Sequence, residues 1–408
     1  MTHRLYYDQT YLRAFDAQVL EVRREQARAL LRLDRSAFYP TSGGQPYDTG
    51  TLGGEAVRDV FVDEAGEVWH ALRPETPLQA GDSVHGEIDW ARRFDHMQQH
   101  GGEHLLAGMV YRQLGGATIG LHLGAQDSTI DVTLPDGRTR LTEIELAALE
   151  DEVNLHIEED LPIRCWFPSP DELAALPLRK APTVTGHVRV VAMGEVEMVA
   201  CGGTHPSSTG QIGLLKILDA TPARGKLRLR FVCGMRALQD YRMVRTGAEK
   251  AACLLSAKLD HLPASVQSLK DELSSLRREL AETRRQQALA RVQALYDRAE
   301  PLPDGARLVT ASLGDVTPES LREVASSLIE RPRTLALLAA ARPDGGFQLL
   351  FARSADLTAD MGALLRACGA KGGGKPDFAQ GSAPQAEPVF ANARAALERP
   401  DGSSSKEK

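Results

Sequence analysis

The sequence predicts an α+β protein with a small N-terminal β-barrel, an α+β core, a helical linker and a C-terminal α/β domain. The first observation is the length of 408 residues, which is enough for about two to four domains. The second is a change of pattern near residue 90, where short strand-like runs give way to helical periodicity. The third is a heptad-spaced apolar seam ahead of a final stretch in which strand-like and helix-like segments alternate.

The composition is that of a folded chain without membrane-spanning segments. Hydrophobic residues make up 42% and charged residues 25% of the chain, both near globular averages. The longest apolar run, Thr334 to Ala341, is far shorter than the roughly 20 residues that a transmembrane helix requires. The N-terminus has no apolar segment after its first charges, so we expect neither a secretory signal nor a membrane partner.

Charge and cysteine content narrow the expected partners and compartment. The formal net charge of −7 argues against a protein that coats nucleic acid non-specifically, although it permits a local basic groove. The five cysteines are scattered and form no C-x-x-C pair. We therefore expect free thiols and a cytoplasmic location.

Residues 1–90 are predicted to form the β-barrel, because their short runs alternate or carry β-branched residues and are punctuated by Gly, Pro and Asp. A sandwich of the same strands is the alternative. The expected strands are 18–22, 28–33, 56–62, 67–71 and 83–88.

Residues 91–234 are predicted to form the α+β core. A helix is expected over 90–114, where a Gly-Gly pair stops it. Thr142 and Glu145 have the spacing of a capping box at the start of a second helix, which we expect to run through Leu155. The expected strands are 128–134, 184–191 and 226–233.

Residues 235–300 are predicted to form a helical hairpin or coiled-coil linker, broken at Pro263. After the break, five apolar residues step by three and four, which is the a/d spacing of a coiled coil. The seam is short, so an intramolecular hairpin or a dimer stalk fits it better than a long coiled coil. Its members are Val266, Leu269, Leu273, Leu276 and Leu280.

Residues 301–400 are predicted to form the C-terminal α/β domain, since strand and helix patterns alternate along them. Strands are expected over 306–312, 334–342 and 347–353, and helices over 319–329, 358–367 and 388–397. A Gly-rich loop is expected before the last helix. The polar residues 401–408 are expected to be a disordered tail.

Two short segments carry residue types that bind metal ions. His100 and His104 lie four apart on the expected helix, hence on one face about one turn apart. Cys201 and His205 flank a Gly-Gly-Thr segment, whose glycines allow a tight loop to present both side chains inward. Three imidazoles and one thiolate suit Zn²⁺, so we predict one zinc ion per chain at these residues.

The two-histidine helix also matches the H-x-x-E-H pattern of inverted zinc peptidases, in which the glutamate, here Glu103, activates water. Such an enzyme needs a further carboxylate ligand downstream. The candidates are Glu145, Glu150 and Glu152. This alternative leaves the Cys-Gly-Gly-Thr-His segment unexplained.

Two glycine-rich segments are candidates for ligand binding. In the first, Ser-Gly-Gly-Gln-Pro, Gly43 and Gly44 allow close backbone approach and Gln45 offers an acceptor and donors; a simple hairpin turn is the alternative. In the second, Lys371 and Lys375 flank glycines in the manner of an anion-binding nest. Its glycines are Gly372, Gly373 and Gly374. A proline follows Lys375, so the segment is not a P-loop, and its expected ligand is a phosphodiester backbone; a flexible loop is the alternative.

Taken in chain order, these motifs resemble those of alanyl-tRNA synthetases. We expect no adenylate-forming aminoacylation half ahead of them, and the chain resembles the long form of the free-standing alanyl-tRNA editing proteins, the AlaX type. The resemblance implies an editing core shared with threonyl-tRNA synthetases, of the second additional domain type, and a C-terminal tRNA-binding domain like that of DHH phosphoesterases. It further implies hydrolysis of seryl- or glycyl-tRNA(Ala), with mischarged tRNA(Ala) as partner. We also expect a homodimer held by the linker or the C-terminal domain.

Carried over residue by residue, the resemblance assigns His100, His104, Cys201 and His205 to zinc, Gln45 to the editing pocket and residues 371–374 to tRNA binding. Ser36 stands where the family has threonine. We expect Ser36 and Gln45 to select the amino acid, because a pocket that hydrogen-bonds the serine hydroxyl rejects alanine. Glu103 is our candidate general base, and zinc is expected to orient the aminoacyl end and to polarise its carbonyl or help to generate hydroxide.

A third interpretation is a non-catalytic tRNA-binding module in which zinc is structural. Such a module would keep its tRNA affinity through Lys371 and Lys375 but would show no turnover. A deacylation assay separates it from the enzyme.

Overall fold

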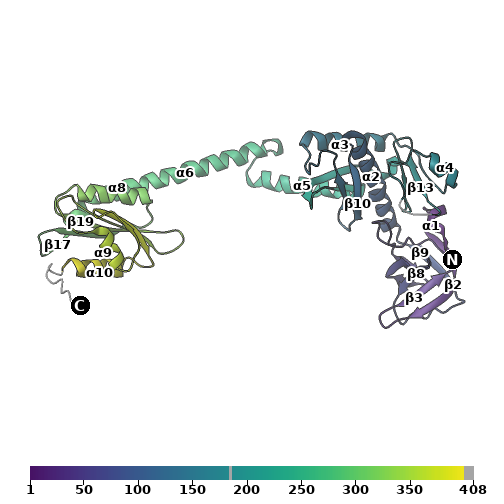
Figure 1. Ribbon diagram of the computed structural model, residues 1–408, viewed down its shortest axis with the longest axis horizontal. Helices are drawn as coiled ribbons and strands as arrows, with labels where there is room; N and C mark the ends of the chain where they lie inside the picture. The colour runs from purple at the N-terminus through teal and green to yellow at the C-terminus, as the bar shows by residue number, and fades with distance from the viewer. Residues whose placement is uncertain (183–185, 399–408) are drawn as a thin grey trace. The chain divides into compact units, whose positions relative to one another are not determined.

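The computed structural model describes residues 1–182 and 186–398 (Figure 1). The chain divides into two compact units, Met1–Lys250 and Ala251–Lys408. The finer division into domains stays a prediction, and the expected tail, 401–408, lies outside the described residues. Among the helices described, none combines the length and the apolar character needed to cross a bilayer.

The N-terminal part of the first unit is a seven-stranded antiparallel sheet. Its strands, in spatial order, are β6 (Glu55–Val57), β5 (Gly50–Leu52), β9 (Ser83–Ile88), β2 (Ala14–Arg24), β3 (Ala29–Leu33), β8 (Val68–Leu72) and β7 (Asp59–Val62). The two end strands, β6 and β7, are separated in sequence by Arg58 alone, whose N–H donates to the carbonyl of Ala71 at 2.8 Å. The sheet is therefore nearly closed, as expected for the predicted barrel.

Short elements surround this sheet. Strands β1 (His3–Arg4) and β4 (Arg35–Ser36) pair in parallel, and the single-turn helix α1 (Leu5–Asp8) follows β1 directly. Asp48 and Arg93 form a fully buried ion pair, with the Arg93 Nε donating to the Asp48 carboxylate at 2.8 Å. Because Asp48 lies beyond the Ser-Gly-Gly-Gln-Pro loop and Arg93 on the next helix, the pair ties the nearly closed sheet to the core.

Helix α2 (Trp90–Leu114) has the bounds expected from the sequence and lies at the centre of the core. Asp89 caps its N-terminus by accepting the Arg92 N–H at 3.2 Å, and Gly115, with φ +63°, ends it. A Cβ at Gly102 would lie 2.2 Å from the Cys233 Sγ. The glycine pair that weakens the helix therefore serves to bring it against its neighbours.

A four-stranded antiparallel sheet packs on α2. Its order is β10 (Ala117–Leu123), β11 (Ser128–Thr133), β16 (Lys226–Cys233) and β15 (Leu215–Ala223). Helix α3 (Glu143–Glu158) follows with the predicted capping box, in which the Glu145 N–H donates to the Thr142 Oγ1 at 3.2 Å and the Thr142 N–H donates to Glu145 at 2.8 Å. The prediction of this helix is confirmed, with one further turn at its end.

A second, three-stranded antiparallel sheet completes the core. Its order is β12 (Ile163–Trp166), β13 (Val190–Met193) and β14 (Glu197–Ala200), with α4 (Pro170–Ala175) and the 3₁₀ helix η1 (Thr209–Ile212) nearby in sequence. The strand expected over 184–191 is wrong in its first half: residues 186–189 are not strand, and 183–185 lie outside the described residues. Glycine at 186 and histidine at 187 are poor strand residues, which accounts for the late start.

Three helices follow the core: α5 (Met235–Leu254), α6 (Leu262–Ala290) and α7 (Val292–Asp297). Pro263 lies in the first turn of α6, where proline is tolerated, so it marks a helix start. The heptad seam lies along α6, and its five apolar side chains are between 43% and 54% exposed.

The second unit contains a six-stranded sheet with helices on both faces. Its order is β17 (Glu300–Pro301), β18 (Arg307–Ser312), β19 (Thr334–Ala341), β20 (Phe347–Arg353), β22 (Phe378–Ala383) and β21 (Lys371–Gly374). Helix α8 (Pro318–Ile329) covers one face, and α9 (Met361–Ala367) and α10 (Glu387–Leu397) cover the other (Figure 1). Strands β18 and β19 are parallel and the other pairs are antiparallel, so the strands and helices alternate along the chain as expected, but the sheet is mainly antiparallel.

The Gly-rich segment predicted to be a loop is instead the edge strand β21, which pairs with β22. A Cβ at Gly372 would lie 2.2 Å from the Gln380 carbonyl oxygen, and a Cβ at Gly374 would lie 2.3 Å from that of Phe378. The glycines therefore permit a close strand pairing that any side chain at these positions would obstruct.

Candidate metal centre

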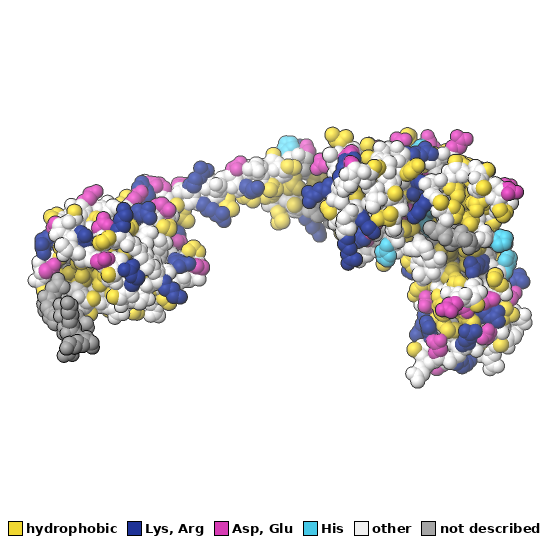
Figure 2. All heavy atoms as spheres, in the orientation of Figure 1, with side chains coloured by type: hydrophobic (Ala, Val, Ile, Leu, Met, Phe, Trp, Pro, Cys, Tyr) yellow, Lys and Arg dark blue, Asp and Glu magenta, His cyan; other side chains and the backbone are white. Residues whose placement is uncertain are grey.

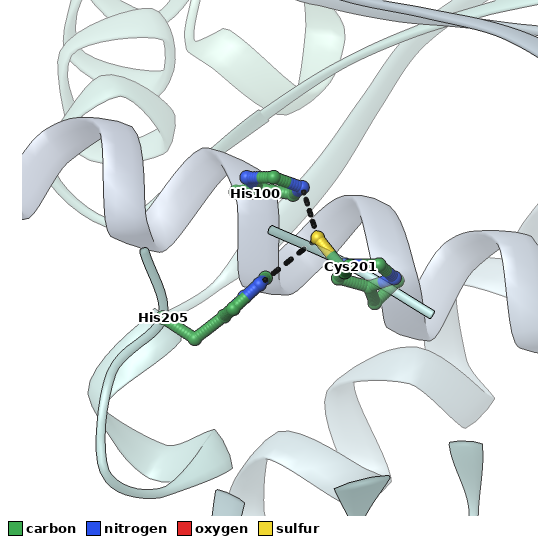
Figure 3. Close-up of side chains that lie close together, drawn as sticks. His100, Cys201 and His205 are labelled. Atoms are coloured by element: carbon green, nitrogen blue, oxygen red, sulfur yellow. Dashed lines mark hydrogen bonds between the residues drawn. The ribbon is translucent and has the colours of Figure 1, made fainter. Parts of the chain in front are cut away.

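The four predicted ligands come together. Their ligand atoms, two from α2 and two from the loop after β14, all lie within 4.8 Å of one another. Cys201 is central, with its Sγ 3.4 Å from the Nε2 of His100 and 3.4 Å from the Nε2 of His205 (Figure 3). The ring of His104 lies 5.0 Å from that of His100 and 4.9 Å from that of His205.

The donor atoms of this cluster fit a zinc ion. Both ring nitrogens of His104 and the Nδ1 of His205 are buried and have no hydrogen-bond partner among the described residues. A buried polar atom without a partner costs about 1–3 kcal/mol, so a cation that bound one of the His104 nitrogens would remove part of this cost. Three imidazole nitrogens and one sulfur at these separations form the soft tetrahedral set that Zn²⁺ prefers.

The protonation states of the cluster residues also suit a bound cation. Burial lowers the pKa of His100 to about 3, with a further contribution from Arg189, and it lowers the pKa values of His104 and His205 well below the usual range. The imidazoles are therefore neutral and their lone pairs are available. Burial raises the pKa of the Cys201 thiol to about 12, so a thiolate at this position needs a positive ion beside it.

Gln45 braces His100. Its Oε1 lies 2.8 Å from the Nδ1 of His100 and also accepts the Thr204 N–H at 3.2 Å, while its Nε2 donates to the Thr204 Oγ1 at 2.8 Å. Because Oε1 can only accept, the Nδ1 of His100 carries the proton and its Nε2 lone pair faces Cys201. The Ser-Gly-Gly-Gln-Pro loop is thus a hairpin turn, closed by Ser42 and Gln45 backbone hydrogen bonds, and also a support for a metal ligand.

At two glycines of the site, neighbouring atoms lie so close to the backbone that no side chain would fit. Gly44 has φ +85°, and a Cβ there would lie 2.7 Å from the Leu121 carbonyl oxygen, so this loop fits against β10 only without a side chain. A Cβ at Gly203 would lie 2.1 Å from the Cε1 of His100. The neighbours Gly43 and Gly202 are exposed and face more open space.

Arg189 is a residue of the site that the sequence analysis missed. Its Nη1 donates to the carbonyls of Gly203 at 2.8 Å and Cys201 at 3.2 Å, and its side chain is buried. The guanidinium therefore fixes the backbone of the loop that carries two metal ligands. The signal that could have identified it is a single arginine within the otherwise apolar run Val188 to Val191.

Glu103 lies beside the cluster, with its Oε2 3.5 Å from the Nδ1 of His104. Burial raises its pKa to about 7, and Arg179 acts in the opposite direction. Arg179 is itself paired with Glu197, its Nε donating to the Glu197 Oε1 at 2.8 Å. The Glu103 carboxylate thus lies next to His104 but outside the four-residue cluster.

Two family models match the chain. "Threonyl and Alanyl tRNA synthetase second additional domain" matches residues 188–230, and "tRNA synthetases class II (A)" matches residues 3–92. The alanyl-tRNA editing protein AlaX-M of Pyrococcus horikoshii is 32% identical over 233 residues, which cover 56% of this chain and 96% of AlaX-M. This chain belongs to the alanyl-tRNA editing protein family.

Longer relatives extend the similarity. The alanyl-tRNA editing protein AlaX-L of Pyrococcus horikoshii is 37% identical over 247 residues, which cover 58% of this chain and 59% of AlaX-L. The alanine–tRNA ligase of Pyrobaculum neutrophilum is 34% identical over 397 residues, 93% of this chain and 42% of the ligase. The chain thus spans less than two thirds of the length of these two relatives.

In this family member, Ser36 lies in the interior of the nearly closed sheet. Its Oγ is 2.7 Å from the Nε2 of His70 and accepts the Phe38 N–H at 3.1 Å. The hydrogen bonds of Ser36 thus go to the sheet interior and not to the metal ligands. Its expected part in amino-acid selection stays a prediction.

The three glutamates proposed for a peptidase have other partners, and Glu152 lies 3.6 Å from the Nε2 of His156. Glu145 completes the α3 capping box, and Glu150 accepts the Ile217 N–H at 2.7 Å and pairs with Lys216 at 2.7 Å. In the part of the chain that the structure describes, the four-residue cluster contains no carboxylate. The geometry therefore favours the editing-family interpretation.

The second unit of this editing-family chain has a cavity of about 600 Å³ at the β21–β22 hairpin. Gly373, Gly374 and Lys375 line it, and Arg322, Phe378 and Gln380 add a guanidinium, an aromatic ring and an amide. The Arg322 guanidinium carbon lies 5.9 Å from the Phe378 ring centroid. The predicted Lys371–Lys375 segment therefore borders this cavity, whose lining also includes the carboxylate of Asp377.

Proposed function

We propose that this chain is a zinc-dependent aminoacyl-tRNA deacylase. Its substrates are mischarged tRNA(Ala), chiefly Ser-tRNA(Ala), with Gly-tRNA(Ala) second, and it acts in the cytoplasm. The observation that carries the proposal is the convergence of three histidines and one cysteine within 4.8 Å in a member of the alanyl-tRNA editing family.

His100, His104, Cys201 and His205 would hold the zinc ion, which supplies a Lewis acid for the ester carbonyl when bound. Gln45 keeps His100 in the tautomer that offers its Nε2 lone pair. Glu103 accepts the proton of the attacking water, whose oxygen forms a bond to the carbonyl carbon. The ester C–O bond then breaks, the amino acid leaves as a carboxylate and the ribose oxygen takes a proton.

Selection of serine over alanine is the task of Gln45, with Ser36 as a second candidate. The Gln45 Nε2 uses one N–H on Thr204, so its second N–H is free to donate to a serine hydroxyl. Alanine would leave this buried donor without a partner, which disfavours it as a substrate. Gly43 and Gly44 leave the loop without side chains where the aminoacyl end approaches.

The second unit would hold the body of tRNA(Ala) through Lys371, Lys375 and the glycines between them, beside the cavity that Arg322 and Phe378 line. On the face shown in Figure 2, Lys and Arg side chains are interspersed with Asp and Glu, so binding depends on local sites of this kind. The exposed seam along α6 would pair with a second copy in a homodimer.

The decisive experiment is deacylation of Ser-, Gly- and Ala-tRNA(Ala) by the zinc-loaded chain. We expect hydrolysis of the first two and not of the third, and a loss of at least about 100-fold in the Cys201→Ala, His205→Ala double variant. Cys253→Ala, at an exposed cysteine on α5, is the matched control. Equal hydrolysis by wild type and double variant would overturn the zinc-site proposal.

The same variants distinguish the two other interpretations. A peptidase would cleave peptides in a manner that depends on Glu103 and survives the loss of Cys201. A non-catalytic module would bind tRNA(Ala) through Lys371 and Lys375 without releasing amino acid from any charged tRNA.

A further inference from the structure

We propose that Tyr7 and Phe167 form the binding site for the 3′-terminal nucleotide of the RNA substrate, with its base stacked on the exposed Phe167 ring, against which Tyr7 packs edge-on. This inference rests on the proposed deacylase function and adds to it the residues that recognise the end of the RNA. Neither residue belongs to the motifs that define the metal centre.

The two rings extend from the metal-ligand loop toward the surface. Tyr7 lies on α1, and Phe167 directly follows β12. A Cβ at Gly202 would lie 3.4 Å from the Tyr7 hydroxyl oxygen, so this ring reaches the loop at the residue next to Cys201. The ring centroids of Tyr7 and Phe167 are 5.7 Å apart at an interplanar angle of 73°, and Phe167 is 45% exposed.

Two guanidinium groups flank the Tyr7 ring. The Cζ of Arg4 lies 5.9 Å and that of Arg189 lies 5.3 Å from its centroid. Arg189 is 4% exposed, and its Nε and Nη2 have no hydrogen-bond partner among the described residues. The nearby acid of α1, Asp8, accepts a hydrogen bond from His3 at 3.1 Å. Glu67, whose charge acts on Arg4, accepts the Thr2 N–H at 2.9 Å. The two guanidinium groups beside the Tyr7 ring favour the phosphate of a nucleotide.

The chemistry of the ester explains why a nucleotide belongs here. In an aminoacyl-tRNA the amino acid is joined to the ribose of the last nucleotide, so only that ribose separates the scissile ester from the terminal base. An ester placed at Cys201 brings the base close to the residues that border Gly202. An exposed aromatic ring near arginines, such as that of Phe167, is a group on which proteins stack unpaired bases.

The test uses the zinc-loaded full-length chain and Ser-tRNA(Ala). We expect Phe167→Leu and Tyr7→Leu each to raise KM about 10-fold with kcat changed by less than about twofold, because stacking is lost while the reacting groups are kept. Phe167→Trp restores a stacking face and should restore KM. Tyr111→Leu, at a 51% exposed tyrosine of α2, is the matched control and should keep the wild-type KM.

Binding of the uncharged trinucleotide CCA provides a readout without turnover. Wild type should bind CCA more tightly than CCU, because a purine stacks better than a pyrimidine, and Phe167→Leu should lose that preference. If wild type hydrolyses Ser-tRNA(Ala) while the variants keep its KM and its trinucleotide preference, this site is overturned and the deacylase function stands. If no charged tRNA is hydrolysed, the function fails, and the trinucleotide titration still decides the site.

Discussion

The Oε1 of Gln45 lies 2.8 Å from the Nδ1 of His100, although the two residues are 55 positions apart in the chain. The bond joins a loop of the N-terminal sheet to the helix that carries two metal ligands. It fixes the tautomer and the ring orientation of His100, so the proposed metal affinity depends on Gln45.

Removal of the Gln45 side chain should therefore weaken zinc binding more than it destabilises the fold. We expect Gln45→Ala to reduce zinc affinity about 10- to 100-fold, because an imidazole without its outer hydrogen bond is poorly oriented. Competition with a chromogenic chelator measures the affinity, and Gln26→Ala, at an exposed glutamine, is the control. An unchanged zinc affinity would mean that His100 needs no brace.

The two glycines of the Cys-Gly-Gly-Thr-His loop should differ in tolerance. Gly203→Ala places a Cβ 2.1 Å from His100, so we expect loss of zinc and destabilisation by about 1–3 kcal/mol or more. Gly202→Ala meets only the Tyr7 hydroxyl at an ordinary 3.4 Å and should retain zinc. Zinc content and melting temperature of the two variants check this, and identical behaviour of the pair would contradict the described loop.

Chelation of the metal should destabilise the first unit as well as stop hydrolysis. Linkage predicts a stability loss of about 4 kcal/mol if zinc is present at 1,000 times its dissociation constant. Thermal melts with and without a chelator measure the shift, and the Cys201→Ala, His205→Ala variant should show little response. A wild-type melt that the chelator leaves unmoved would speak against a bound metal.

Stability should fall on mild acidification because of His70. Burial lowers the pKa of His70 to about 4, whereas an unfolded histidine titrates near 6.5. Between these values the unfolded chain binds a proton that the folded chain does not, so stability is complete above pH 6.5 and decreases as the pH falls toward 4, by about 2 kcal/mol at pH 5.

Urea unfolding of the zinc-loaded chain at pH 8 and pH 5 measures this loss. In the His70→Gln variant the difference between the two pH values should shrink by that amount, and His85→Gln, at an exposed histidine of β9, is the surface control. Wild type and His70→Gln with the same pH dependence would rule out His70 as the cause.

The seam of α6 should determine the oligomeric state. Leu273 and Leu276 are 48% and 54% exposed in the single chain, and a second copy would bury them. We expect the double variant Leu273→Lys, Leu276→Lys to sediment as a monomer. The control variant Arg277→Lys, at a charged neighbour, should remain a homodimer. A wild-type chain that sediments as a monomer would remove the dimer proposal.

Local patterns were sufficient to predict several elements. The α2 bounds and the α3 capping box follow from periodicity and from the Thr142 and Glu145 spacing, which depend on neighbouring residues only. The convergence of His100, His104, Cys201 and His205 could be predicted because histidine and cysteine at these spacings have few other uses together. The Ser36–His70 hydrogen bond joins β4 to β8, two strands that belong to different sheets, and nothing local in the sequence indicates it.

The edge strand β21 and the role of Arg189 could not be predicted from the sequence. Glycine is a poor strand former, so Lys371–Gly374 was expected to be a loop, yet the hairpin needs glycine because the carbonyls of β22 lie so close. Arg189 stands in an apolar run where its charge is unexpected, but its partners are backbone carbonyls that no sequence pattern identifies.

The fit of Gly102 against Cys233 has a consequence for how the metal centre could change over evolution. The space for a Cβ is already filled by the Cys233 sulfur, so the helix bearing His100 and His104 can neither slide nor turn without displacing β16. The position of His100 and His104 therefore depends on how α2 packs against β16. Substitutions at position 233 should therefore alter the metal site, and changes there should be accompanied by compensating changes in α2.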